Sequence, residues 1–200
     1  MANINPIMYL IQTEESLKAG EFEEFDTQRE ELIKKSRDVL KLSKLVIYAV
    51  HRDDLAPAKK LVQEMERERQ KLEAIAKHNQ TLLMEGSYKV ALQEYAEALL
   101  YYTLLTEETL LSPATLKIKS TFYIIGLCDL TGELVRKAVF LAGKSQTKEV
   151  IKIKEVVDFI YGELLKFNFR DNEIRHKFDA VKYDLKKLED LVLELKLKGR

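Results

Sequence analysis

The chain has 200 residues, which is the length of one ordinary domain. Of these residues 46% are hydrophobic, which is enough to fill a sizeable core. This composition excludes a mainly disordered protein, and only seven glycines and three prolines leave little room for the turns of a β-sandwich. The 33 basic and 33 acidic residues cancel, so net charge alone cannot attract a nucleic acid. Any basic surface must therefore be local.

Cys128 is the only cysteine, which excludes an internal disulfide framework. We expect it to be a small core residue rather than a nucleophile, because the histidines are scattered over different predicted helices, as His51, His78 and His176. No stretch reaches the roughly 18 apolar residues of a membrane span, and the N-terminal segment is too acidic for a secretion signal. These features predict a soluble, cytoplasmic protein with no membrane partner.

Apolar residues recur every three or four positions between a few breaking residues such as Gly20, which predicts helices. The first predicted helix covers 22–51, and the second runs from about residue 56 to 83. Two strongly apolar segments follow, at 88–105 and 116–142, with Ser112 and Pro113 between them. Helices that are apolar on most sides are expected at the centre of a bundle.

The C-terminal part of the chain completes the pattern. An amphipathic helix is predicted at 148–167, and the last helix has apolar residues at alternating spacings of four and three between Ile174 and Leu195. No repeat or linker divides the sequence. We therefore predict an all-α fold of about seven helices in a single domain over 1–200, with 1–20 the least defined part.

Four acidic residues lie inside the two most apolar segments. Glu94 and Glu97 are three residues apart, and Asp129 and Glu133 are four apart, so each pair shares one helix face. The four acids converge if the two helices are antiparallel neighbours. Buried carboxylates repel one another, and an oxygen-only ligand set without histidine favours Mg²⁺ or Mn²⁺ over zinc. This pattern indicates metal-assisted phosphoryl chemistry with a metal-activated water.

Each acid also has a purely structural interpretation. Glu94 and Glu97 are equally well explained as a polar helix edge matched by lysines from elsewhere in the fold. Glu133 is followed three residues later by Arg136, which is the spacing of a simple helix ion pair. Asp129 is harder to explain in this way, because apolar residues surround it in the sequence.

A basic stripe is the second pattern, and it lies on the first predicted helix. Its members follow alternating spacings of three and four: Lys34, Arg37, Lys41, Lys44, Tyr48 and His51. Such a stripe can meet phosphate groups. The alternative, usually favoured for a run of lysines, is a solvated face paired with Glu30, Glu31 and Asp38.

These same residues resemble the translin and translin-associated factor X family. The similar stretches are LQEYAEA at 92–98, LCDLTGELVR at 127–136, KKSRDVLKLSK at 34–44 with the later pair His51 and Arg52, and the C-terminal 175–200. Together they place the resemblance over roughly 22–200. The DLTGE and KYDLKK stretches are its most specific parts.

The resemblance implies a seven-helix protein that assembles into a hollow octamer and binds single-stranded RNA and DNA. Members of the factor X type are Mg²⁺-dependent endoribonucleases, whereas the translin type has lost acids of the catalytic set. This chain keeps all four acids, so it resembles the catalytic branch, in a prokaryotic or archaeal form. Its C-terminus is similar to that of translin, which favours a homo-oligomer.

The expected site follows from this resemblance together with the spacing of the acids. Glu94, Glu97 and Asp129 are expected to hold Mg²⁺ or Mn²⁺, and Glu133 to complete the metal shell or accept a proton from the water. The nucleic-acid-binding residues are expected to be Lys34, Arg37, Lys41, Lys44, His51, Arg52 and Arg136, with Arg136 on the scissile phosphate.

The main alternative is a non-catalytic, translin-like assembly that binds single-stranded RNA or DNA and uses the acids only as structure. A di-iron or dimanganese carboxylate bundle normally needs Glu-x-x-His on two helices, and the four acids have no such histidine. A pure helical scaffold would require lysines paired with all four acids.

Overall fold

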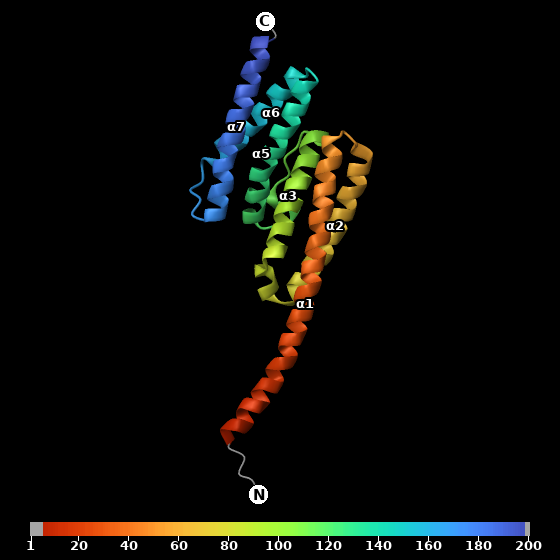
Figure 1. Cartoon of the computed structure of the whole chain (residues 1–200), viewed down its shortest axis with the longest axis vertical. Coiled ribbons are helices and arrows are strands. Elements are labelled where there is room, and N and C mark those ends of the chain that lie inside the picture. Colours follow the sequence, from red (N-terminus) through yellow and green to blue (C-terminus); the bar gives the residue numbers. More distant parts are fainter. Residues whose placement is uncertain (1–5, 199–200) are drawn as a thin grey trace.

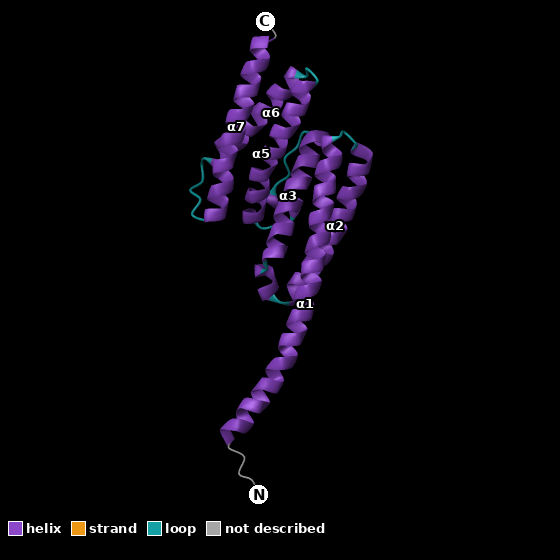
Figure 2. Ribbon diagram, in the orientation of Figure 1, coloured by secondary structure: helices purple, strands orange, loops and turns teal. Residues whose placement is uncertain are grey.

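The computed structural model describes residues 6–198, with side chains described from Phe22 onward. All regular structure in this part of the chain is helical (Figure 2), so the predicted all-α fold is confirmed. The long helices are α1 (Pro6–His51), α2 (Leu55–His78), α3 (Gly86–Glu107), α5 (Ser120–Gly143), α6 (Thr147–Leu164) and α7 (Asn172–Lys198). A 3₁₀ helix, η1 (Gln80–Met84), and a single turn, α4 (Pro113–Leu116), lie between them.

The first helix is longer than predicted. α1 begins at Pro6 and passes through Gly20, so the expected break at this glycine is wrong. One glycine inside a helix costs only about 1 kcal/mol relative to alanine, which good helix formers on both sides offset, and proline is tolerated in a first turn. The N-terminal part of α1 projects beyond the other helices (Figure 1).

Two other boundaries differ from the sequence prediction because polar side chains cap short elements. α2 ends at His78, and the Asn79 side chain accepts a hydrogen bond from Thr81 N at 2.9 Å, which starts η1. Ser112 caps α4 in the same way, and Lys117, at a φ of 55°, ends it. The apolar helix predicted from residue 116 therefore begins only at Ser120.

The helices pack in an order that places α3 at the centre. α1 contacts α2 and α3, α3 contacts α5, and α5 contacts α6 and α7 (Figure 1). α3 and α5 run in the same direction, since Tyr88 near the start of α3 packs against Phe122 near the start of α5. The antiparallel arrangement that we expected is wrong, because the segment after α3 returns along the bundle before α5 begins.

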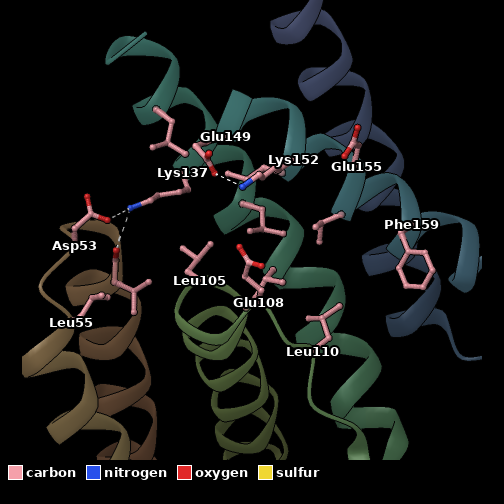
Figure 3. A pocket seen from close by; sticks show the side chains of 16 residues that line it. Asp53, Leu55, Leu105, Glu108, Leu110, Lys137, Glu149, Lys152, Glu155 and Phe159 are labelled. Carbon is pink, nitrogen blue, oxygen red and sulfur yellow. Dashed lines mark hydrogen bonds and ion pairs between the residues drawn. The ribbon is translucent and has the colours of Figure 1, made fainter. Parts of the chain in front are cut away.

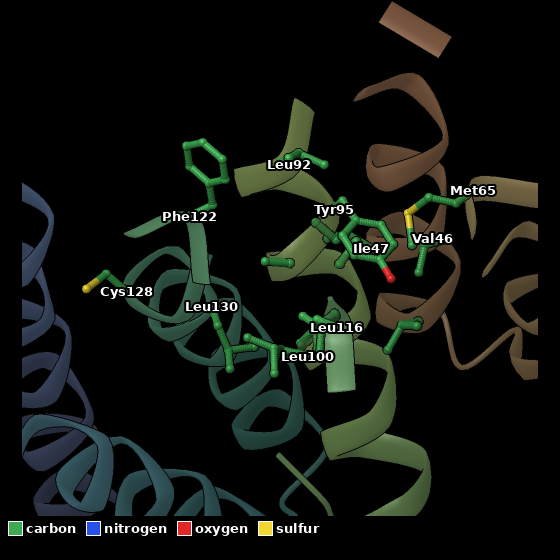
Figure 4. Packing of buried hydrophobic residues seen from close by; sticks show 14 of the residues in the cluster. Val46, Ile47, Met65, Leu92, Tyr95, Leu100, Leu116, Phe122, Cys128 and Leu130 are labelled. Carbon is green, nitrogen blue, oxygen red and sulfur yellow. The ribbon is translucent and has the colours of Figure 1, made fainter. Parts of the chain in front are cut away.

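The hydrophobic core runs between all the long helices, and Figure 4 shows the part of it that lies in the first half of the bundle and on α5. Val46, Met65, Leu100 and Leu130 are fully buried, so α3 is covered on nearly every side. Cys128 is also buried, as expected, and burial raises the pKa of its thiol to about 12. Among the described residues, no helix is both long enough and apolar enough to cross a membrane.

Candidate functional site

A cavity of about 380 Å³ lies where α1, α3 and α5 meet. Its lining is mostly charged and consists of Lys44, Ile47, Tyr48, His51, Glu94, Glu97, Glu133 and Arg136. Three of the four predicted acids thus face one cavity, and Asp129 lies one helical turn before Glu133 on α5. The convergence expected from the sequence occurs only in part, because Asp129 does not line this cavity, and it occurs between parallel rather than antiparallel helices.

Glu94 and Glu97 on α3 are the uncompensated members of this group. Glu97 is only 8% exposed, and neither carboxylate has a hydrogen-bond or ion-pair partner among the side chains described. Burial, together with the charges of the other three acids, raises the pKa of Glu97 to about 8. Burial also raises the pKa of Glu94, against the opposing effect of Lys44. The fold therefore leaves the carboxyl groups of Glu94 and Glu97 in this cavity without a described side-chain partner.

Glu133 is held from two sides. Its carboxylate is hydrogen-bonded to Nε2 of His51 and receives two hydrogen bonds from Arg136 Nη1, at 2.8 and 3.0 Å. Burial alone would raise the pKa of Glu133, but these hydrogen bonds lower it. Nδ1 of His51 lies 3.0 Å from the Tyr101 hydroxyl. The predicted Arg136 pairing is present, whereas the contribution of Tyr101 was not foreseen.

Asp129 is held by a residue that the sequence pattern did not identify. Lys177 Nζ on α7 donates to both Asp129 carboxylate oxygens, at 2.7 and 2.9 Å. Burial still raises the pKa of Asp129 against this ion pair. Asp129, Glu97 and Glu94 together raise the pKa of Lys177 despite its own burial. The two partners are far apart in the chain, so no local spacing could have revealed them.

The donor set fits a hard divalent cation in its chemistry, although the four acids are not closed into a ligand shell. Among the described residues, no three His, Cys, Asp or Glu side chains lie close enough to hold a metal ion as they stand. Asp129 is ion-paired with Lys177, and Glu133 contacts both His51 and Arg136. The carboxylates of the buried Glu97 and the partly buried Glu94 are oxygen ligands of the kind that Mg²⁺ and Mn²⁺ prefer.

The basic stripe of α1 is exposed. Lys34, Arg37, Lys41 and Lys44 point away from the core, and none forms an ion pair with a described side chain. Asp38, which we expected to be a possible partner, instead contacts Lys35 at 3.0 Å. These four residues are therefore not paired with Glu30, Glu31 or Asp38, although the stripe is solvent-exposed as that alternative expected.

The remaining predicted basic residues lie at the cavity end of α1 or opposite it. Arg52 is exposed and contacts Asp54 at 3.3 Å, and Arg136 extends from α5 beside Glu133. His51 is only 13% exposed and contacts Glu133, so it belongs to the acid cluster rather than to the exposed stripe. The sequence placed His51 on the correct helix face but could not show its partner.

A larger cavity, of about 670 Å³, is lined by residues from α1, α3, α5 and α6 and contains none of the predicted site residues (Figure 3). Its walls are mainly apolar. Lys137 lies in its wall and donates to Asp53 at 2.5 Å and to the Val50 carbonyl at 3.4 Å (Figure 3). These contacts hold the end of α1, and the cluster of acids remains in the smaller cavity.

Known proteins match this chain over most of its length. Residues 27–199 match the model of the translin family. An uncharacterised protein of Methanocaldococcus jannaschii is 28% identical over 81% of this chain and 73% of its own length. Translin-associated protein X of Rattus norvegicus is 26% identical over 88% of this chain and 76% of its own length.

Solved structures share the fold. The crystal structure of apo-NeC3PO superimposes with a TM-score of 0.84 and 24% identity, over 97% of this chain and 100% of that chain. A complex of AfC3PO with duplex RNA superimposes with a TM-score of 0.82 and 23% identity, over 94% of this chain and 97% of that chain. The family resemblance of the sequence motifs is thus confirmed: the chain belongs to the translin family.

Proposed function

We propose that this protein is a metal-dependent endoribonuclease that cleaves single-stranded RNA. The observation that carries the proposal is the pair of unpartnered acids, the buried Glu97 and the partly buried Glu94, next to Asp129 and Glu133. A divalent cation held by these acids would offset their negative charge beside a polyanionic substrate. Membership of the translin family and the duplex RNA bound by AfC3PO support RNA as the ligand.

In this proposal, Glu94, Glu97 and Asp129 would hold Mg²⁺ or Mn²⁺, which would supply an activated water and neutralise charge on the phosphodiester. Glu133 has a lowered pKa and is therefore ionised at neutral pH, the form that accepts a proton from water. His51 keeps this carboxylate oriented, and Tyr101 fixes the imidazole through Nδ1. The exposed guanidinium of Arg136 is placed to contact the scissile phosphate.

The single-stranded RNA follows α1 towards the acids. Successive phosphates are bound on the exposed face of that helix by Lys34, Arg37, Lys41 and Lys44, and just beyond its end by Arg52. We propose that copies of this chain form a homo-oligomer, an octamer by family resemblance, that acts in the cytoplasm. A closed assembly concentrates the field of these cations and admits a flexible strand more easily than a stiff duplex.

The proposal is tested by the substitution Asp129→Asn. Purified protein is incubated with a labelled single-stranded RNA in Mg²⁺ or in EDTA, beside Asp158→Asn, which alters an exposed aspartate on α6. We expect cleavage by the wild type and by Asp158→Asn in Mg²⁺ only, and RNA binding without cleavage by Asp129→Asn. Cleavage by Asp129→Asn at the wild-type rate would refute the site.

A non-catalytic RNA-binding assembly is the second candidate. It is favoured by one observation, that Lys177 and His51 already satisfy Asp129 and Glu133 without a metal. This candidate predicts RNA binding without turnover at any concentration of Mg²⁺ or Mn²⁺. Metal-dependent cleavage by the wild type would exclude it.

A further inference from the structure

Tyr48 is an exposed aromatic residue in an otherwise charged cavity. Its side chain is 59% exposed and lines the cavity together with Glu94, Glu97 and Glu133. The other strongly exposed aromatic side chains of the described part of the chain lie elsewhere: Phe22, Phe140, Phe159, Phe167 and Tyr183. A large ring left in water beside a cluster of acids needs an explanation beyond packing, because its neighbours Ile47 and Ala49 already fill the core.

The ring is held in place from one side. Arg52, the first residue after the end of α1, donates from Nη1 to the Tyr48 hydroxyl at 3.3 Å. The Arg52 guanidinium also lies over the ring, 5.6 Å from its centroid. Arg52 itself is anchored to Asp54 at 3.3 Å. These contacts restrict the Tyr48 side chain and leave much of its surface open to a ligand.

The charges around Tyr48 define the chemistry of that ligand. Lys44 lies one turn before it on α1, and Arg52 one turn after it, so phosphates are attracted on both sides. The acids of the cavity repel a phosphate that is not bridged by a cation. A neutral, planar group is therefore best suited to the surface of the ring, with its attached phosphates directed to Lys44 and Arg52.

We propose that Tyr48 is a stacking platform for one unpaired nucleobase next to the acidic cluster, an inference that rests on the proposed nucleic-acid function. The faces of paired bases inside a duplex are covered by their neighbours, so only a single-stranded or extruded base can stack on the ring. Tyr48 thus selects single-stranded over double-stranded substrates, whereas the lysines of α1 bind any phosphate backbone.

Fluorescence anisotropy in EDTA tests this inference without turnover. The probes are a labelled 12-nucleotide RNA, an equal-length strand of abasic phosphodiester units, and a duplex of the same RNA. Tyr48→Ala is expected to weaken RNA binding by about fivefold to 150-fold, the range of one lost base stack. Binding of the abasic strand is expected to stay within twofold of wild type, and the preference for single strands over duplex to fall.

Two further variants separate the ring from other effects. Tyr48→Phe keeps the ring and is expected to bind like wild type, and Tyr183→Ala removes an equally exposed ring on α7 and is expected to change nothing. Circular dichroism melting checks that Tyr48→Ala is folded, and Tyr48→Leu provides a second variant without a ring if it is not.

Three results would overturn the stacking platform while leaving RNA binding intact. They are wild-type affinity in Tyr48→Ala, an equal loss of affinity for the abasic strand, and a loss in Tyr48→Phe as large as in Tyr48→Ala. A wild-type protein that binds none of the probes would overturn both this inference and the proposed function.

Discussion

Gly126 of α5 packs directly against the backbone of Glu97 on α3. A Cβ atom at position 126 would lie 2.9 Å from Glu97 N and 2.7 Å from the Ala96 Cβ. Both distances are shorter than ordinary contacts, so no larger residue fits without moving one of the helices. The glycine therefore sets the spacing between the helix that provides Glu94 and Glu97 and the helix that provides Asp129 and Glu133.

Gly126→Ala is expected to push α5 away from α3. We expect a loss of about 1–3 kcal/mol in the free energy of unfolding, as for other overpacked sites. Metal-dependent cleavage is expected to fall further than this loss of stability explains, because the two pairs of acids separate. Urea unfolding and single-turnover cleavage by the folded variant measure the two effects.

Gly132 provides the matched control on the same helix. A Cβ atom there would meet only Asp184 Oδ2, at 3.7 Å, which is an ordinary contact. Gly132→Ala should therefore be tolerated, and Ala96→Gly should partly restore Gly126→Ala by removing one of the clashing atoms. Equal effects of the two glycine substitutions would contradict this account of the helix spacing.

The stability of the metal-free protein is expected to decrease as the pH rises from about 4.5 to 8. The pKa of Glu97 is raised from 4.5 to about 8, so over this interval the folded state retains a proton that the unfolded state has lost. Each pKa unit corresponds to about 1.4 kcal/mol, which gives an effect of a few kcal/mol. Urea unfolding in EDTA at several pH values measures it.

Glu97→Gln is expected to flatten this pH dependence, because glutamine does not ionise. Glu107→Gln, which alters an exposed residue at the end of the same helix, should retain the wild-type profile. An unchanged slope in Glu97→Gln would show that Glu97 does not carry the effect.

Lys177 is expected to compete with a divalent metal for Asp129. Replacing it by methionine removes the ion pair at 2.7 Å, so Mg²⁺ affinity is expected to rise. The loss of stability in EDTA should be about 1 kcal/mol or less, since the Lys177 side chain is 41% exposed. Calorimetric titration with Mg²⁺ tests this, with Lys187→Met as a control further along α7. Weaker metal binding in Lys177→Met would mean that Lys177 supports the site instead.

The basic stripe predicts a measurable salt dependence. Replacing Lys34 and Lys41 by alanine should weaken RNA binding and reduce the slope of log affinity against log salt by about 0.7 for each lost phosphate contact. The same double replacement at the exposed Lys59 and Lys60 of α2 should leave the slope unchanged. An equal reduction of this slope in both double variants would show that the RNA does not bind preferentially to the basic stripe of α1.

Local spacing was sufficient to predict the helices and the acid pairs. Glu94 and Glu97 share a face of α3 because they are three residues apart, and the apolar surroundings of Asp129 in the sequence match its partial burial in the structure. Arg136 was predictable as a partner of Glu133 from its spacing, but Lys177 and Tyr101 were not. Lys177 reaches Asp129 from α7, and Tyr101 reaches His51 from α3, so only the tertiary arrangement brings them to the site.

The direction of α5 relative to α3 was also beyond the sequence pattern. An apolar helix packs equally well against a parallel or an antiparallel neighbour, and the choice depends on the course of the connecting segment. Glu108 and Lys117, both at positive φ, redirect this segment so that α5 starts beside the start of α3. A glutamate or a lysine in the sequence does not predict a positive φ, because glycine and asparagine are the residues that usually adopt it.

Metal-dependent cleavage at Glu97 and its neighbouring acids is tested most directly by following binding and cleavage of one labelled single-stranded RNA in parallel, for the wild type and for Glu97→Gln, in Mg²⁺ and in EDTA. We expect both proteins to bind the RNA and only the wild type in Mg²⁺ to cleave it. Cleavage by the wild type in EDTA, or by Glu97→Gln at the wild-type rate, would show that these acids do not hold a catalytic metal.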